Sequence, residues 1–102
     1  MTPRVTVYKG ATFNLAARWL DTAGAPRSLA GVVVTAWMGT DAFALPVGTL
    51  VTNAVLGDYV FNALPAAVAT WPVGVWALYA QYDIAGVVTK ELACLLDVQE
   101  AR

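Results

Sequence analysis

Turn residues divide this sequence into short segments, and their spacing limits the fold more than any other feature. Lys9-Gly10, Gly57-Asp58 and Trp71-Pro72 are examples, and such signals recur about every 8 to 12 residues with no long helical period between them. Short apolar segments at this spacing are typical of antiparallel β-sandwiches. We therefore predict an all-β fold, as a single domain over residues 1–102.

The segments between the turns are seven expected strands. They are residues 4–8, 11–20, 32–38, 49–53 and 59–63, then two strands within residues 70–98. A tight turn at residues 83–86 should join the last two, while residues 39–48 should be irregular and 64–71 should form one helical turn between sheets. Seven strands in about 100 residues favour an immunoglobulin-like antiparallel sandwich, although the Cys…Trp…Cys pattern of antibody domains is absent.

The chain is unusually poor in charge. Hydrophobic residues make up 59% of its 102 residues and charged residues 13%, against about 25% charged in ordinary soluble domains. A chain of this length can build a core without disulfides or metal. It lacks, however, the polar side chains that would cover its whole surface, so we expect part of that surface to be buried against something outside the chain.

The residue types exclude several function classes. The six basic residues are scattered, so no basic patch for nucleic acid is expected. The absence of histidine removes the usual general base and the commonest metal ligand. Acidic residues fall mostly in turns without a calcium-loop spacing, and the glycines follow no phosphate-binding order. We predict a protein that is not an enzyme and that holds no metal or cofactor.

A membrane-spanning segment is not expected either. Residues 59–82 carry no charge and reach the length of a spanning helix, but Pro65, Pro72 and Gly74 interrupt them. No basic segment precedes an apolar one at the start of the sequence, so no signal peptide is predicted. The single cysteine, Cys94, cannot form an intramolecular disulfide and should pack as a small hydrophobic residue.

The four tryptophans raise the question of sugar binding, because exposed indole rings stack on sugars. Trp19 and Trp76 share strand phases with other large apolar residues, so we expect both in the core. Trp71 should close one end of the sandwich. Trp37 alone falls in an outward phase, which favours an interface anchor over a sugar platform.

The strand that begins near Val75 is apolar in both phases. A strand with one face on the core and one in water should alternate apolar with polar residues. Val75, Ala77 and Tyr79 fill the phase that should be polar. Because a small domain has only one core, this second phase needs another cover.

In an immunoglobulin-like arrangement the third, sixth and seventh strands lie side by side. Their inward phases would include Val34, Leu78 and Leu92, and their outward phases would form one apolar patch, which marks an interaction site. The candidate interface residues are Val33, Trp37, Val75, Ala77, Tyr79, Ala93 and Leu95. The alternative is that residues 39–48 or 64–71 fold over the sheet and hide the patch.

Several motifs resemble the short immunoglobulin-like structural proteins of tailed bacteriophages and prophages, over residues 10–98. The most specific is the turn Trp71-Pro72-Val73-Gly74 before an alternating strand that ends in Asp83-Ile84. The other matching residues are Gly10-Ala11-Thr12-Phe13, Asp21, Gly24, Pro26, Leu29, Gly31, Val34, Ala36, Gly57 and Gly86. The chain departs from the family in its apolar outer phase and in its short charged end, Gln99-Glu100-Ala101-Arg102.

The resemblance implies a virion component without catalytic residues, assembled in many copies, in the tail, neck or baseplate. Its partners would be copies of itself and other virion proteins, with no nucleic acid and no membrane. Exposed strand edges, above all residues 4–8, would add contacts. Two alternatives stay open: a capsid decoration or cement protein, and a module that binds a host glycan or receptor.

Overall fold

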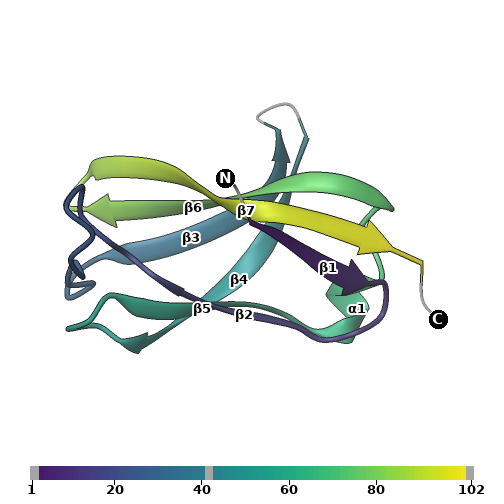
Figure 1. The fold of residues 1–102 in the computed structure, drawn as a ribbon, viewed down its shortest axis with the longest axis horizontal. Helices are drawn as coiled ribbons and strands as arrows, with labels where there is room; N and C mark the ends of the chain where they lie inside the picture. The colour runs from purple at the N-terminus through teal and green to yellow at the C-terminus, as the bar shows by residue number, and fades with distance from the viewer. Residues whose placement is uncertain (1–2, 41–42, 101–102) are drawn as a thin grey trace.

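The computed structural model describes residues 3–40 and 43–100, which are all-β apart from one short helix (Figure 1). The strands are β1 (Arg4–Tyr8), β2 (Phe13–Arg18), β3 (Val33–Thr40), β4 (Phe43–Asn53), β5 (Asp58–Ala63), β6 (Gly74–Ile84) and β7 (Val87–Gln99). The helix α1 (Pro65–Val68) lies between β5 and β6. The prediction of seven strands and one helical turn is confirmed.

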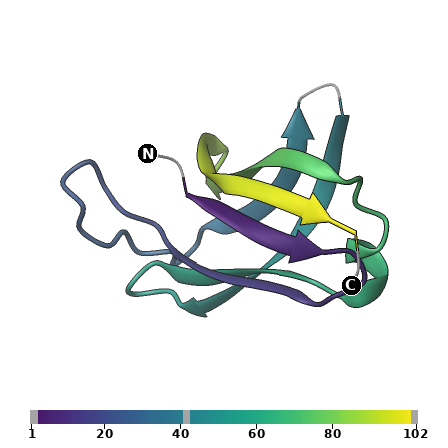
Figure 2. The same ribbon diagram turned by 45° about the vertical axis from the view of Figure 1, so that its right-hand side comes forward.

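The strands form one continuous sheet, in the order β1-β7-β6-β3-β4-β5-β2, that is nearly closed into a barrel. Its two halves face each other around the core (Figures 1 and 2). Layer A contains β1, β7, β6, β3 and residues 43–47 of β4. Layer B contains residues 48–53 of β4 with β5 and β2. Strand β4 therefore belongs to both layers.

The single, nearly closed sheet fits the predicted all-β fold but departs from a sandwich of two separate sheets. Two further features differ from the purely antiparallel arrangement that was predicted. Strand β1 runs parallel to β7, with Arg4 opposite Leu95 (Figure 2), whereas the other strand pairings in the described ranges are antiparallel. Residues 39–48 were expected to be irregular, but residues 39–40 complete β3 and residues 43–48 begin β4, while residues 41–42 lie outside the described residues. Pro46 fits there because this part of β4 pairs only with β3, and proline is tolerated at a sheet edge, where its missing N–H costs no ladder bond.

Gly48 marks the point where β4 passes from one layer to the other. It pairs with Asn62 of β5, whereas the preceding Val47 pairs with Ala36 of β3. A Cβ at Gly48 would overlap the Asn62 side-chain oxygen and lie 2.9 Å from the Asn62 carbonyl oxygen. The crossing therefore requires a residue without a side chain.

The turn between β6 and β7 is the one that the sequence predicts. Ala85 and Gly86 both have positive φ, 50° and 89°, as a type I′ hairpin turn requires. Asp83 Oδ1 accepts a hydrogen bond from the Gly86 N–H at 3.0 Å. The turn leads β6 directly back along β7, so the two strands form one long hairpin.

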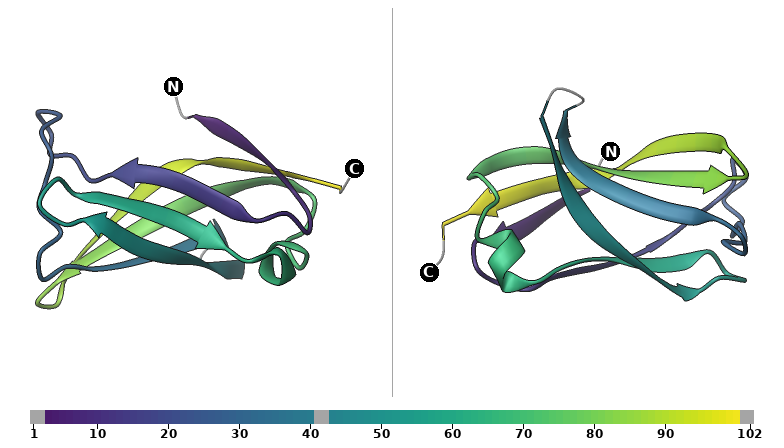
Figure 3. Two further views of the ribbon diagram at one scale, coloured as in Figure 1. Left: turned by 90° about the horizontal axis from the view of Figure 1, so that it is seen from below. Right: turned by 180° about the vertical axis from the view of Figure 1, so that it is seen from behind.

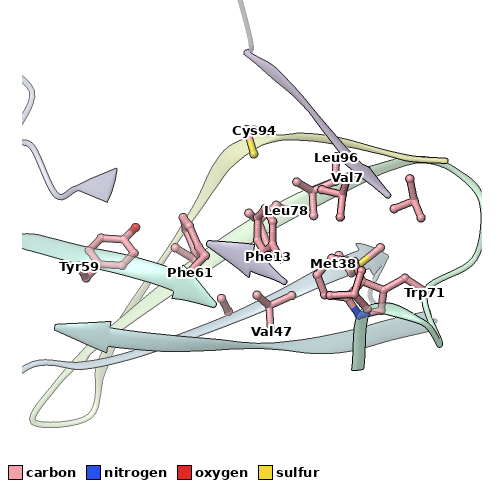
Figure 4. Packing of buried hydrophobic residues seen from close by; sticks show 14 of the residues in the cluster. Val7, Phe13, Met38, Val47, Tyr59, Phe61, Trp71, Leu78, Cys94 and Leu96 are labelled. Atoms are coloured by element: carbon pink, nitrogen blue, oxygen red, sulfur yellow. The ribbon is translucent and has the colours of Figure 1, made fainter. Parts of the chain in front are cut away.

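Alternate residues of both layers point into a common core (Figure 4). Phe61 of layer B and Met38, Leu78 and Leu96 of layer A are fully buried. Burial of each such side chain contributes about 1.5–3 kcal/mol. Cys94 is buried among them, as predicted, and desolvation raises the pKa of its thiol.

Aromatic side chains close the two ends of the core. Helix α1 lies at one end of the molecule (Figure 3). The buried Trp71 ring, which follows this helix, meets Phe13 edge to face at 5.6 Å (Figure 4). At the other end, the hydroxyl groups of Tyr59 and Tyr82 form a hydrogen bond of 2.6 Å. The prediction that Trp71 closes one end is confirmed.

Trp19 is also buried, as predicted, and it stacks on Tyr82 with ring centroids 4.2 Å apart. The Arg27 guanidinium lies 4.0 Å over the same indole. Trp76 packs against the core only in part, and its Nε1 donates a hydrogen bond to the Pro72 carbonyl at 2.9 Å. Burial raises the pKa of Tyr82, so its hydroxyl stays protonated at neutral pH.

Candidate interaction surface

The outer face of layer A carries apolar residues that the core does not use. The register places Trp37 of β3 beside Tyr79 of β6, and Tyr79 beside Leu92 of β7. Two residues along β6, Ala77 lies beside Leu95. Residues directly opposite each other on antiparallel strands share a face. These side chains therefore form one patch across three strands.

Trp37 and Tyr79 form the centre of this patch. Their rings stack with centroids 5.7 Å apart and an angle of 22° between the planes. The Lys90 Nζ lies 5.7 Å from the centre of the Trp37 ring, so a cation accompanies the aromatic pair. Large, rigid aromatic side chains of this kind are the commonest anchors of protein interfaces.

Two of the predicted interface residues are exposed, and the others are partly buried. Neither segment considered as a cover lies over them in the described ranges, since residues 43–47 extend the sheet beside β3 and α1 leads into one end of the core (Figure 3). Val33 is 61% exposed and Val75 is 49% exposed. The residues that are partly buried are Trp37, Ala77, Tyr79 and Leu95.

Ala93, predicted on this face, packs against the core instead. Strand β7 has a bulge here, because Leu78 pairs with Cys94 while the next residue, Tyr79, pairs with Leu92. Ala93 is the extra residue, and an insertion of one residue exchanges the two faces of the strand beyond it. Leu92, predicted to point inward, lies on the outer face and is 46% exposed. Both predictions are wrong for this one reason.

Pro46 and Lys90 also belong to this face and were not predicted there. Pro46 lies opposite Trp37 on β4, in the segment that was expected to be irregular. The alternation of Leu45 and Val47 around it is the sequence signal for a strand, and the proline masks that signal. Lys90 lies opposite Gln81, beyond the bulge. The face of the sheet on which it lies can therefore be assigned only from the strand register.

Charged residues lie at the margins of the patch. Asp97 pairs with Val75 on one side and with Thr6 on the other, and Arg4 lies opposite Leu95. The Asp97 Oδ2 accepts a hydrogen bond from the Gln99 side-chain amide at 3.2 Å. A central apolar region with a charged margin is the usual anatomy of a protein interface.

A shallow hollow of about 470 Å³ lies on layer B. Its lining residues are Ala16, Ala17, Arg18, Thr52, Asp58 and Tyr59. Arg18 donates two hydrogen bonds to the Asp58 carboxylate, of 2.6 Å and 3.1 Å. The Arg18 hydrogen bond lowers the pKa of Asp58, and Asp58 raises the pKa of Arg18. The two charged side chains of this hollow are therefore paired with each other.

Other kinds of site have little support in the described ranges. Within residues 3–40 and 43–100, no three His, Cys, Asp or Glu side chains gather to hold a metal ion. The helix found in that part of the chain is too short to cross a bilayer. No family model matches the sequence, and no curated protein matches it. The functional argument therefore depends on the apolar patch of layer A.

Proposed function

We propose that this protein is a non-enzymatic structural subunit of a tailed-bacteriophage virion. It assembles through the outer face of layer A and through strand edges, as a component of the tail, neck or baseplate. Its partners are copies of itself and other virion proteins. The partly exposed apolar patch around Trp37 and Tyr79 carries the proposal. The motifs that resemble phage structural proteins are the reason for proposing a virion.

The proposal includes an immunoglobulin-like description of the fold. Strands β7, β6 and β3 are neighbours in one layer, and β2, β5 and β4 are neighbours in the other. This neighbour order is that of the immunoglobulin sandwich, whose G, F and C strands face B, E and D. The differences are that β1 pairs with β7 and that β4 joins the two layers.

The free energy of hydration favours covering the patch. Removing apolar surface from water yields about 25 cal/mol per Å². Side chains fixed on a sheet lose less freedom on docking than side chains on loops. A contiguous exposed patch of this kind marks a binding surface rather than an ordinary solvated face.

Unpaired strand edges provide a second means of assembly. Strands β1 and β2 stand at the two ends of the sheet order. Strand β1 covers only residues 95–99 of β7, so residues 87–94 have no neighbouring strand on that side within the described chain. A strand of another subunit can pair with such an edge through main-chain hydrogen bonds.

Replacing Tyr79 and Leu95 together by lysine should prevent self-assembly and leave the fold intact. The two ammonium groups would be buried at the contact without partners. The matched control is Leu50→Lys with Val60→Lys, because these residues are paired on the outer face of layer B. Size-exclusion chromatography with light scattering measures assembly, and circular dichroism checks the fold. Normal assembly of the first variant, or an equal loss in the control, would refute the proposed face.

Experiments on phage particles test whether this protein is part of a virion, and they distinguish the proposed role from its alternatives. Antibody labelling and electron microscopy of particles induced from cells that carry this gene should place the chain in the tail, neck or baseplate. Label on the head surface would favour a decoration or cement protein, and unlabelled particles would exclude a virion role. A stable monomer that binds sugars on a glycan array would favour the glycan-binding module.

A further inference from the structure

We propose that two copies of this chain pack layer A against layer A about a two-fold axis that passes over Leu78. This inference rests on the proposed function, because it names the partner and the register of the same patch. Leu78 lies between Ala77 and Tyr79 on β6, and its own side chain is fully buried in the core. The axis would run across the strands, in the plane between the two sheets.

The patch consists of a row of large side chains beside a row with a small one at its centre. Trp37, Tyr79 and Leu92 stand in one row across β3, β6 and β7. The next outward row, two residues or about 6.6 Å along the strands, contains Ala77 beside Leu95. The Ala77 methyl group is small and leaves space above it, whereas the Tyr79 ring in the first row fills the corresponding space.

A two-fold axis that runs between these two rows places the row of large side chains of one copy over the row that contains Ala77 in the other copy, and the reverse. Tyr79 of one copy then meets Ala77 of the other, and Leu92 meets Leu95. Each contact occurs twice, because the axis exchanges the two copies. The face is therefore complementary to itself, which is what a two-fold interface requires.

The charges at the margins give the same axis independently. Lys90 lies opposite Gln81 of β6, and Asp97 lies opposite Val75. Gln81 and Val75 are each three residues from Leu78, in opposite directions (81 − 78 = 78 − 75 = 3). Rotation about the axis therefore places Lys90 of each copy over Asp97 of the other, and neither side chain has an ion-pair partner within the described residues.

The area of the outer face of layer A agrees with the area that a two-fold dimer interface requires. Five strands about 4.8 Å apart, with about nine residues at about 3.3 Å each, have a footprint of about 600 Å². Standard interfaces bury about 800 Å² of accessible surface on each partner, and accessible surface exceeds the footprint of a face covered with side chains. Two such sheets pack about 10 Å apart, which the interdigitated rows would fill.

Charge reversal tests the register. Lys90→Glu and Asp97→Lys should each weaken the dimer about tenfold or more, because each change brings like charges together at two symmetry-related positions. The double variant restores opposite charges and should recover the affinity of the unmodified chain. Sedimentation velocity over a concentration series measures all four proteins. Single variants that bind as tightly as the unmodified chain, or a double variant without recovery, would show that the register is wrong.

Replacing the small residue Ala77 by a large one tests the proposed packing of the two rows. Ala77→Phe should abolish the dimer, whereas Ala16→Phe, on the exposed outer face of β2, should not. If assembly persists in these variants but is lost with Tyr79→Lys and Leu95→Lys, the two-fold register fails and the proposed face stands. If that lysine pair also assembles normally, the proposed function fails as well. An unmodified chain that stays monomeric overturns the dimer, and capture of another virion protein by the same face would then support the structural role alone.

Discussion

The outer faces of the two layers differ, although both layers contribute alternate residues to one core. The outward residues of β2 in layer B are Asn14, Ala16 and Arg18. The outward residues of β6 in layer A are Val75, Ala77 and Tyr79, and only then Gln81 and Asp83 toward the hairpin turn. Layer B follows the half-polar pattern of an antiparallel sheet that faces water. The first half of β6 does not.

The two outer faces therefore differ in where their charged residues stand relative to the apolar ones. On layer B, Arg18 of β2 and Asp58 of β5 pair across the outer face. On layer A, Lys90 and Asp97 stand at the margins of the patch, on either side of its large side chains. The inner faces supply the core for both layers, and the proposed assembly depends on the apolar centre of the outer face of layer A.

The largest expected effect is the difference in stability between substitutions of inward and outward residues of β6. Leu78→Ala should lower the free energy of unfolding by about 2–5 kcal/mol, because it opens a cavity in a fully buried position. Tyr79→Ala, one residue further, should weaken assembly and change the stability of the monomer much less. Urea denaturation at low protein concentration and sedimentation velocity measure the two quantities. A larger loss of assembly for Leu78→Ala would break the distinction between the two faces.

A smaller effect is expected where the layers meet inside. Tyr59 of layer B and Tyr82 of layer A are buried and share a 2.6 Å hydrogen bond. Tyr82→Phe leaves the Tyr59 hydroxyl buried without this partner, which should cost about 1–3 kcal/mol. The pair Tyr59→Phe with Tyr82→Phe should cost less than the sum of the single changes. Thermal or urea unfolding measures the cycle, and strict additivity would argue against a direct bond.

The smallest effect concerns the ion pair on the outer face of layer B. The pKa of Asp58 is lowered by the Arg18 hydrogen bond, so the stabilisation is complete above the ordinary aspartate pKa of about 3.9 and is lost as the pH falls through the lowered value. Arg18→Gln should therefore differ slightly from the unmodified chain at pH 7. The difference in melting temperature should vanish in acid, and a difference that persists at the lowest pH would have another origin.

Local residue chemistry made much of the fold predictable. The turn at Asp83 to Gly86 and the burial of Trp71 follow from neighbouring residues, and both were predicted. The bulge at Ala93 was not predictable, because it depends on which residue of β6 faces it and no local residue type announces it. The bulge also changes the candidate site, because it places Leu92 rather than Ala93 on the outer face. The parallel pairing of β1 with β7 was missed for a similar reason, since it joins opposite ends of the chain.

By itself, the sequence determined most of the strands, several of their turns and an excess of apolar side chains, because these depend on residue type and on spacing along a few neighbours. Only the tertiary structure decided which strands lie together, that β4 spans both layers at Gly48 and that Trp37 stacks on Tyr79. Pairing between distant segments is a competition among many registers, and it is settled by packing over the whole core rather than by any one segment.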